Sequence, residues 1–258
     1  MYKTMIDFNL EIDLDPTRVK NSPIFVAGLP GMGLTGKQAA DYLIEQFNAT
    51  KVGYINAPHL ASPVISSHNG VVEDLMNELF QLYYAEVGEK SFLIFTGITQ
   101  PSSPEWQHHL SYKVIDTLRI YKPKIIYTFA ATPIYSYRWA VNVYGIATRR
   151  DLLEELRLYG VIPFKGEGVI SGVNGLLIGY GKRFGIDGII LLGETYLTTG
   201  RDLIAPLSLL RVFSKIVDVE IDLRKMEELA ISFHKKFSEY VKGEKGEDTG
   251  PEKLGYIS

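Results

Sequence analysis

A glycine-rich stretch between an apolar run and a helical pattern constrains this chain more than any other feature. It reads Gly28-Leu-Pro-Gly-Met-Gly-Leu-Thr-Gly-Lys37 and follows the apolar run Ile24-Phe-Val-Ala27. The apolar residues after it recur with the period of a helix: Ala39, Ala40, Leu43, Ile44 and Phe47. This order predicts a strand, a tight turn and a helix, an arrangement whose backbone N–H groups point toward an anion.

Two phosphate-binding motifs overlap in this stretch. Residues 31–36 match G-x-G-x-x-G, and residues 31–37 match G-x-x-x-x-G-K. The second motif requires Ser or Thr after the lysine to bind Mg²⁺, but position 38 is Gln. The first requires an acidic residue near the end of the next strand to bind a ribose, and the strand over residues 52–56 ends with Asn. Two interpretations stay open: a nucleotide site, or a turn that packs a helix closely against a sheet.

Buried strands alternate with helical patterns along most of the chain. Strands are expected at residues 8–14, 24–28, 51–56, 79–87, 91–97, 124–131, 141–147 and 188–192. The helix after the glycine turn is expected to end near residue 47. Further helices are expected over residues 104–121, 149–159, 176–184, 203–217 and 222–241, and Ser103 and Pro104 mark the start of the first of these. The dipeptide Asn69-Gly70 favours a β-hairpin within residues 64–87. The pattern predicts an α/β sheet covered on both faces, with an inserted hairpin.

Composition and length bound the class of protein. The chain has 258 residues and no cysteine, which excludes disulfides, thiolate metal sites and a cysteine nucleophile. A formal net charge of −3 gives no basic surface for nucleic acid. We find no signal-peptide pattern and no apolar stretch of about 18 residues, so we expect a cytoplasmic protein without a membrane partner. We expect one domain over residues 1–241 and a flexible polar tail over residues 242–258.

Catalytic and metal-binding motifs are incomplete. The five histidines lack the spacing of a metal site, and the serines lack a G-x-S-x-G motif. We therefore expect no metal, no cofactor and no hydrolase triad.

Ligands of α/β sheets bind beyond the carboxyl ends of the strands. The residues expected there form a candidate anion-binding pocket: Gly31, Gly33, Gly36, Lys37, Gly97 and Glu194. If a ligand binds, Lys37 and the amides of Gly33 and Gly36 hold the anion, and Glu194 is the acid or base. The alternative is that the glycines let helices pack tightly and that Lys37 is solvated.

Two segments carry residues suited to binding a protein partner. Tyr135, Tyr137 and Trp139 follow a predicted strand end and belong to the residue types enriched at interface hot spots, although a core role is the alternative. The tail carries Leu254, Tyr256 and Ile257, which are either idle or form a docking peptide.

Four segments in one order resemble the prokaryotic branch of the proteasome assembly chaperone family. They are residues 28–43, 95–101, 168–175 and 191–195, within a resemblance that covers residues 8–240. It implies a three-layer α/β/α, Rossmann-like fold akin to that of nucleoside phosphorylases, with a mostly parallel sheet. It also implies a homo-oligomer that binds proteasome core (α-type) subunits without catalysis. Some family members bind through a C-terminal hydrophobic–Tyr–any-residue signature, whereas Tyr256 is third from the end here.

The leading hypothesis is therefore a non-catalytic proteasome assembly chaperone-like protein that uses the aromatic segment and the tail as contacts. The alternative is a nucleotide- or nucleoside-binding enzyme that uses the Gly31–Lys37 turn. A third hypothesis is a ligand-sensing protein whose pocket regulates assembly.

Overall fold

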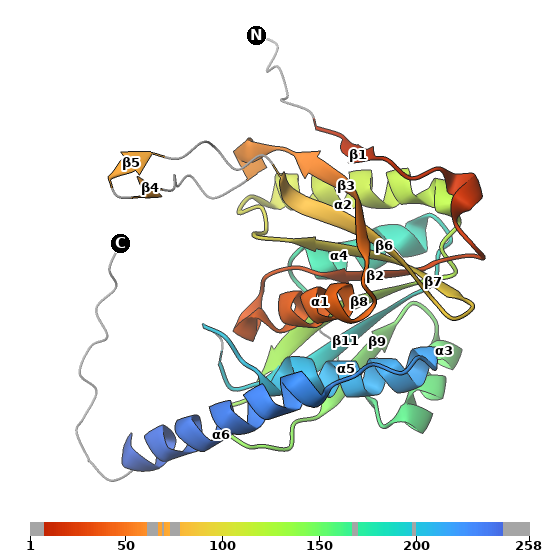
Figure 1. Cartoon of the computed structure of the whole chain (residues 1–258). Coiled ribbons are helices and arrows are strands. Elements are labelled where there is room, and N and C mark those ends of the chain that lie inside the picture. Colours follow the sequence, from red (N-terminus) through yellow and green to blue (C-terminus); the bar gives the residue numbers. More distant parts are fainter. Residues whose placement is uncertain are drawn as a thin grey trace.

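The computed structural model describes residues 8–60, 67–68, 70–72, 78–166, 170–197 and 200–244. Within them, helices cover both faces of one large twisted sheet (Figure 1). The sheet has nine strands in the order β1-β3-β6-β7-β2-β8-β11-β9-β10. The predicted α/β/α class is confirmed.

The centre of the sheet is parallel. It consists of β7 (Lys90–Gly97), β2 (Ile24–Gly28), β8 (Ile125–Pro133) and β11 (Gly188–Thr195). On one side β6 (Glu78–Val87), β3 (Thr50–Asn56) and β1 (Leu10–Ile12) continue as antiparallel neighbours. On the other side β9 (Val143–Ala147) is antiparallel to β11, and β10 (Ile162–Pro163) runs parallel to β9.

The two faces of the sheet carry different helices. One face packs against α1 (Thr35–Gln46), α3 (Arg150–Leu156), α5 (Ile204–Val217) and α6 (Arg224–Glu244). The other packs against α2 (Pro104–Leu118) and α4 (Val173–Arg183). Because side chains alternate along a strand, Val26 of β2 joins the first core, while Phe25 and Ala27 join the second. The sequence pattern of β2 is uniformly apolar because both of its faces are buried.

The inserted hairpin is present. The strands β4 (Ser67–His68) and β5 (Val71–Val72) pair antiparallel, while Asn69 of the predicted turn lies outside the described residues. The last strand of the predicted hairpin region is β6, which belongs to the main sheet.

Two predicted helix boundaries were wrong. The helix α4 begins at Val173 instead of 176, since Gly172 has a positive φ of 88° and the Val173 amide donates to the side chain of Gln100. The helix α6 continues to Glu244, past the predicted domain boundary, and projects beyond the sheet (Figure 1). Residues 245–258 lie outside the described residues, so the flexible tail stays a prediction.

The strand that follows the glycine turn is not a neighbour of the strand that precedes it. The sheet order places β7 and β6 between β2 and β3. With strands about 4.8 Å apart, β3 lies roughly 14 Å from β2. The end of β3 is therefore too far from the turn to supply the ribose-binding residue of a dinucleotide motif, whichever residue stands at position 56.

Candidate functional site

The glycine turn lies between β2 and α1, and its glycines allow close packing. A Cβ atom added to Gly28 would lie 2.1 Å from the carbonyl oxygen of Gly36, and one added to Gly36 would lie 2.2 Å from that of Phe129. Gly33 has a φ of 62°, in the left-handed region that favours glycine. The approach of α1 to β8 thus accounts for Gly36 of the phosphate motif, and the backbone conformation accounts for Gly33, whereas a Cβ added to Gly31 would meet only the Gln100 side chain, at 3.9 Å.

Gln38, which departs from the phosphate motif, has a structural role that the sequence did not reveal. Its buried amide group donates to the carbonyl oxygens of Gly33, at 3.0 Å, and of Asp202, at 2.6 Å. The Asp202 amide in turn donates to the Gly33 carbonyl at 2.9 Å, and Arg201 donates to the Gln38 side chain. This network ties the turn to the start of α5. The mismatch at position 38 was the one sequence signal for it.

Lys37 is held by a neighbour on its own helix. Its Nζ lies 2.7 Å and 2.8 Å from the two carboxylate oxygens of Asp41, one helical turn away.

Gly97 allows close packing, as Gly28 and Gly36 do, because an added Cβ would lie 2.6 Å from the ring of Phe80 and 2.8 Å from Leu29.

A cavity of about 530 Å³ opens beyond the carboxyl end of β8, as expected for this class of sheet. It lies between the glycine turn and the start of α4. Its described lining comprises Leu29, Gly31, Met32, Gly36, Gln100, Gln107, Ala130, Ala131, Thr132, Pro133, Ile146, Phe164, Ile170, Ser171, Gly172, Asn174 and Leu192. None of these residues carries a charge. Of the six predicted pocket residues, the lining includes Gly31 and Gly36 but not Gly33, Lys37, Gly97 or Glu194.

Side chains of the lining already bind the backbone around the cavity. The Gln100 side chain accepts from the Val173 amide at 2.8 Å and donates to the Pro30 carbonyl, and Asn174 accepts from the Leu29 amide at 3.2 Å. One amide of the α4 N-terminus is therefore engaged. The remaining surface suits an uncharged ligand better than a phosphate, since no cation faces the cavity among these lining residues.

Glu194 is a buried carboxylate at the end of β11, with a side chain that is 3% exposed. It accepts from the Asn142 amide at 2.8 Å, the Asn142 side chain at 3.2 Å, the Tyr144 hydroxyl at 3.0 Å, and Arg138, with which it forms an ion pair. Burial acts to raise the pKa of Glu194, but the hydrogen bonds from Asn142, Arg138 and Tyr144 outweigh it and leave the pKa below the usual value. This carboxylate anchors the segment before β9 instead of facing the 530 Å³ cavity.

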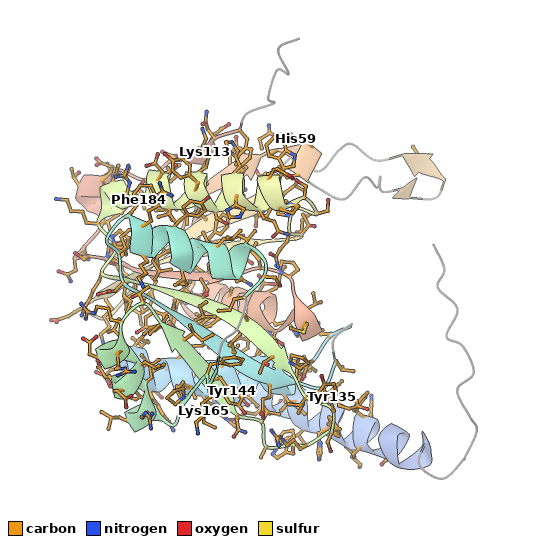
Figure 2. All side chains as sticks on the ribbon, turned by 180° about the vertical axis from the view of Figure 1, so that it is seen from behind. His59, Lys113, Tyr135, Tyr144, Lys165 and Phe184 are labelled. Atoms are coloured by element: carbon orange, nitrogen blue, oxygen red, sulfur yellow. The ribbon has the colours of Figure 1, made fainter. Side chains whose placement is uncertain are left out.

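The predicted aromatic surface is partly covered by α6. Tyr137 packs against Tyr196 and against His234 and Phe237 of α6, and Trp139 packs against His234. Phe237 also contacts Tyr196 and Phe233, and we call Tyr196, Phe233, His234 and Phe237 the α6 aromatic cluster. The Tyr137 hydroxyl lies 2.8 Å from Nδ1 of His234, and burial together with Asp202 raises the pKa of Tyr137 to about 12. Tyr135 in contrast is 97% exposed and lies at the surface beside α6 (Figure 2). Leu254, Tyr256 and Ile257 lie outside the described residues.

Two further findings concern the described part of the chain only. It contains no group of three or more His, Asp and Glu residues placed to hold a metal ion. None of its helices combines the length and apolar character needed to cross a membrane.

Comparison with known proteins identifies relatives over nearly the whole chain. The sequence model of the PAC2 family matches residues 25–241. A protein of Methanocaldococcus jannaschii, the uncharacterized protein MJ1210, is 28% identical in an alignment of 254 residues that covers 95% of this chain and 95% of that protein. The crystal structure of Pyrococcus furiosus PbaB, an archaeal proteasome activator, is similar with a TM-score of 0.79 and 29% identity, covering 92% of this chain and 99% of PbaB. Pyrococcus furiosus PbaA, an archaeal homolog of proteasome-assembly chaperone, shares the fold with a TM-score of 0.71 and 22% identity, covering 89% of this chain and 94% of PbaA.

Proposed function

This chain belongs to the PAC2 family, and from that premise we propose that it is a non-catalytic, chaperone-like protein that binds proteasome core α-type subunits. The observation that carries the proposal is the similarity to PbaB, an archaeal proteasome activator, over almost the full length of both chains. The described lining of the 530 Å³ cavity carries no charged residue, and Glu194 is engaged in structural hydrogen bonds; both observations also favour a role without catalysis. We further propose that the protein acts as a homo-oligomer in the cytoplasm.

Tyr135 is the proposed anchor for the partner. Its side chain is 97% exposed, whereas Tyr137 and Trp139 on the same segment are held by the α6 aromatic cluster. Glu194 holds the segment over residues 135–142 through a hydrogen bond from the Asn142 amide and an ion pair with Arg138. A rigid segment that presents an aromatic side chain loses little conformational entropy on binding, which is a property of interface hot spots.

The tail is the second proposed contact. An apolar tip at Leu254, Tyr256 and Ile257 suits a pocket on a partner, and a polar tether lets it reach that pocket. Because α6 ends at Glu244, truncation after this residue removes the tail and leaves the described helix intact.

The test is binding of the full chain to purified proteasome α-type subunits, measured by biolayer interferometry. We expect Tyr135→Ala to weaken binding about tenfold or more, as for a hot-spot residue. Leu158→Ala is the matched control, since Leu158 is also an exposed apolar side chain, at 83%, but belongs to the turn after α3. Truncation after Glu244 should weaken binding separately. Absence of binding by the full chain would contradict the proposal, while light scattering of the free protein tests the homo-oligomer.

A second candidate function is binding of a nucleotide or nucleoside beside the Gly31–Lys37 turn. The cavity of about 530 Å³ favours it, since ligand sites of this size are common in α/β proteins. A panel of nucleosides, nucleotides and inorganic phosphate in a thermal-shift assay tests it. Stabilisation by nucleosides but not by phosphate would fit the uncharged lining, and no shift with any compound would reject this function.

A further inference from the structure

A second cavity lies at the opposite end of the sheet from the glycine turn. It has a volume of about 470 Å³ and is enclosed by the amino ends of β2, β7, β8 and β11 together with α3 and the end of α5. Apolar side chains form much of its described lining: Ile24, Ile125, Leu152, Leu156, Ile189, Ile216 and Val217. This volume is within the range of small-molecule sites.

The charged groups of this cavity divide into paired and unpaired residues. Lys90 donates to the carbonyl oxygens of Val217, at 2.6 Å, and Asp218, at 2.8 Å, at the end of α5. Arg149 forms an ion pair with Asp187, at 3.1 Å. Lys124 and Glu155 also line the cavity, and both are exposed. Neither has an ion-pair partner among the described residues, so one cation and one anion are available to a ligand.

Tyr127 supplies an unpaired hydroxyl to the same cavity. Its side chain projects from β8, is 6% exposed and packs edge-on against Phe213, with ring centroids 5.3 Å apart. The hydroxyl makes no hydrogen bond within the described part of the chain and is not among its fully buried unpaired polar atoms, so its oxygen borders the cavity and is open to a ligand. Burial, and to a smaller extent Glu155 and Tyr159, raise the pKa of Tyr127, so the hydroxyl stays protonated and can donate or accept.

We propose that this cavity binds a free zwitterionic amino acid with a large side chain that ends in a polar group, as in tyrosine or tryptophan. Its carboxylate pairs with Lys124 and its ammonium group with Glu155, while the ring contacts the apolar walls. The polar end of the ring reaches the Tyr127 hydroxyl. This arrangement gives Lys124, Glu155 and Tyr127 a binding partner each within one ligand of common size.

Isothermal titration calorimetry of the full chain with L-tyrosine and L-phenylalanine tests the inner contact. We expect L-tyrosine to bind about tenfold more tightly, the ratio for one hydrogen bond. The variant Tyr127→Phe should remove this preference and leave binding of L-phenylalanine unchanged. Its melting temperature should stay close to that of the native protein, because the hydroxyl that the substitution removes has no hydrogen-bond partner in the described part of the chain.

Ligands that lack one charge test the outer contacts. Lys124→Met should weaken the binding of L-tyrosine and of 3-(4-hydroxyphenyl)propionate, which has only the carboxylate. It should not change the binding of tyramine, which has only the ammonium group. Glu155→Gln should weaken the binding of L-tyrosine and tyramine but not that of 3-(4-hydroxyphenyl)propionate. Lys182→Met, on the exposed surface of α4, should change the binding of none of the three. No binding of either aromatic amino acid at millimolar concentration would overturn the proposal. Binding that is insensitive to Tyr127→Phe, Lys124→Met and Glu155→Gln would also overturn it, by placing the ligand elsewhere.

Discussion

The carboxylate of Glu194 accepts a 2.8 Å hydrogen bond from the backbone amide of Asn142, so that a buried negative charge fixes the segment leading into β9. The same carboxylate accepts from Tyr144 at 3.0 Å and pairs with Arg138. These partners lie on both sides of Asn142, and the exposed Tyr135 precedes them on the same segment. Glu194 thus links the rigid centre of the sheet to the proposed partner-binding surface.

Glu194→Gln is expected to lower the free energy of unfolding by about 2 kcal/mol, because hydrogen bonds to a charged, buried acceptor contribute more than neutral ones. Chemical denaturation measures the change. Glu154→Gln is the control: Glu154 pairs with Arg157 at 2.8 Å, but both side chains are more than half exposed, so the change there should stay below about 0.5 kcal/mol. Equal effects of the two substitutions would contradict the prediction, since they would mean that the burial of Glu194 adds nothing to its contribution to the free energy of unfolding.

The stability contribution of Glu194 should depend on pH in a defined direction. Its pKa in the folded protein is below the ordinary value of 4.5, so the unfolded chain binds the proton more tightly. The contribution is therefore complete above about pH 4.5 and is lost as the pH falls through the folded-state pKa. The difference in unfolding free energy between the native protein and Glu194→Gln, measured from pH 7 to pH 3, should shrink over this range. A difference that is constant with pH would contradict the role of the ionised form.

Two glycine substitutions should act in opposite directions. Gly36→Ala places a Cβ 2.2 Å from the carbonyl oxygen of Phe129, a backbone atom that cannot move aside easily, so we expect a loss of about 3 kcal/mol or more. Gly179 lies within α4, and outside that helix's own backbone and the neighbouring residues no described atom lies within 4 Å of an added Cβ, so Gly179→Ala should stabilise the protein by about 0.5–1 kcal/mol. Thermal unfolding of both variants checks the prediction, and tolerance of Ala at position 36 would show that α1 does not pack as described.

Lys37→Met should leave the protein nearly as stable as the native chain, within about 0.5 kcal/mol, because its ion pair with Asp41 is a helix-surface pair. Neither protein should be stabilised by inorganic phosphate in a thermal-shift assay, since Lys37 does not line the 530 Å³ cavity. A phosphate-dependent shift that Lys37→Met abolishes would restore the anion-binding interpretation of the turn.

Local sequence signals predicted an element well where the residues that form and cap it lie within one short segment. Ser103 and Pro104 predicted the start of α2, and the Ser103 hydroxyl indeed accepts from the Trp106 amide at 3.3 Å. Asp202 comes just before α5, and its carboxylate accepts from the Ile204 amide at 2.7 Å. The start of α4 was missed, because Gln100, far away in the sequence, supplies the acceptor for Val173.

The sequence alone determined the strand–turn–helix at residues 24–46. The period of the apolar residues, the positions of the glycines and the spacing between them and Lys37 are all local properties of the chain. Only the tertiary structure decided what the turn can do. Chain connectivity places two strands, β6 and β7, between β3 and β2. Asp41 forms an ion pair with Lys37, and the Gln38 side chain donates to the backbone of Asp202. These outcomes depend on which distant segments become neighbours, and that choice is made by the packing of two cores around the whole sheet.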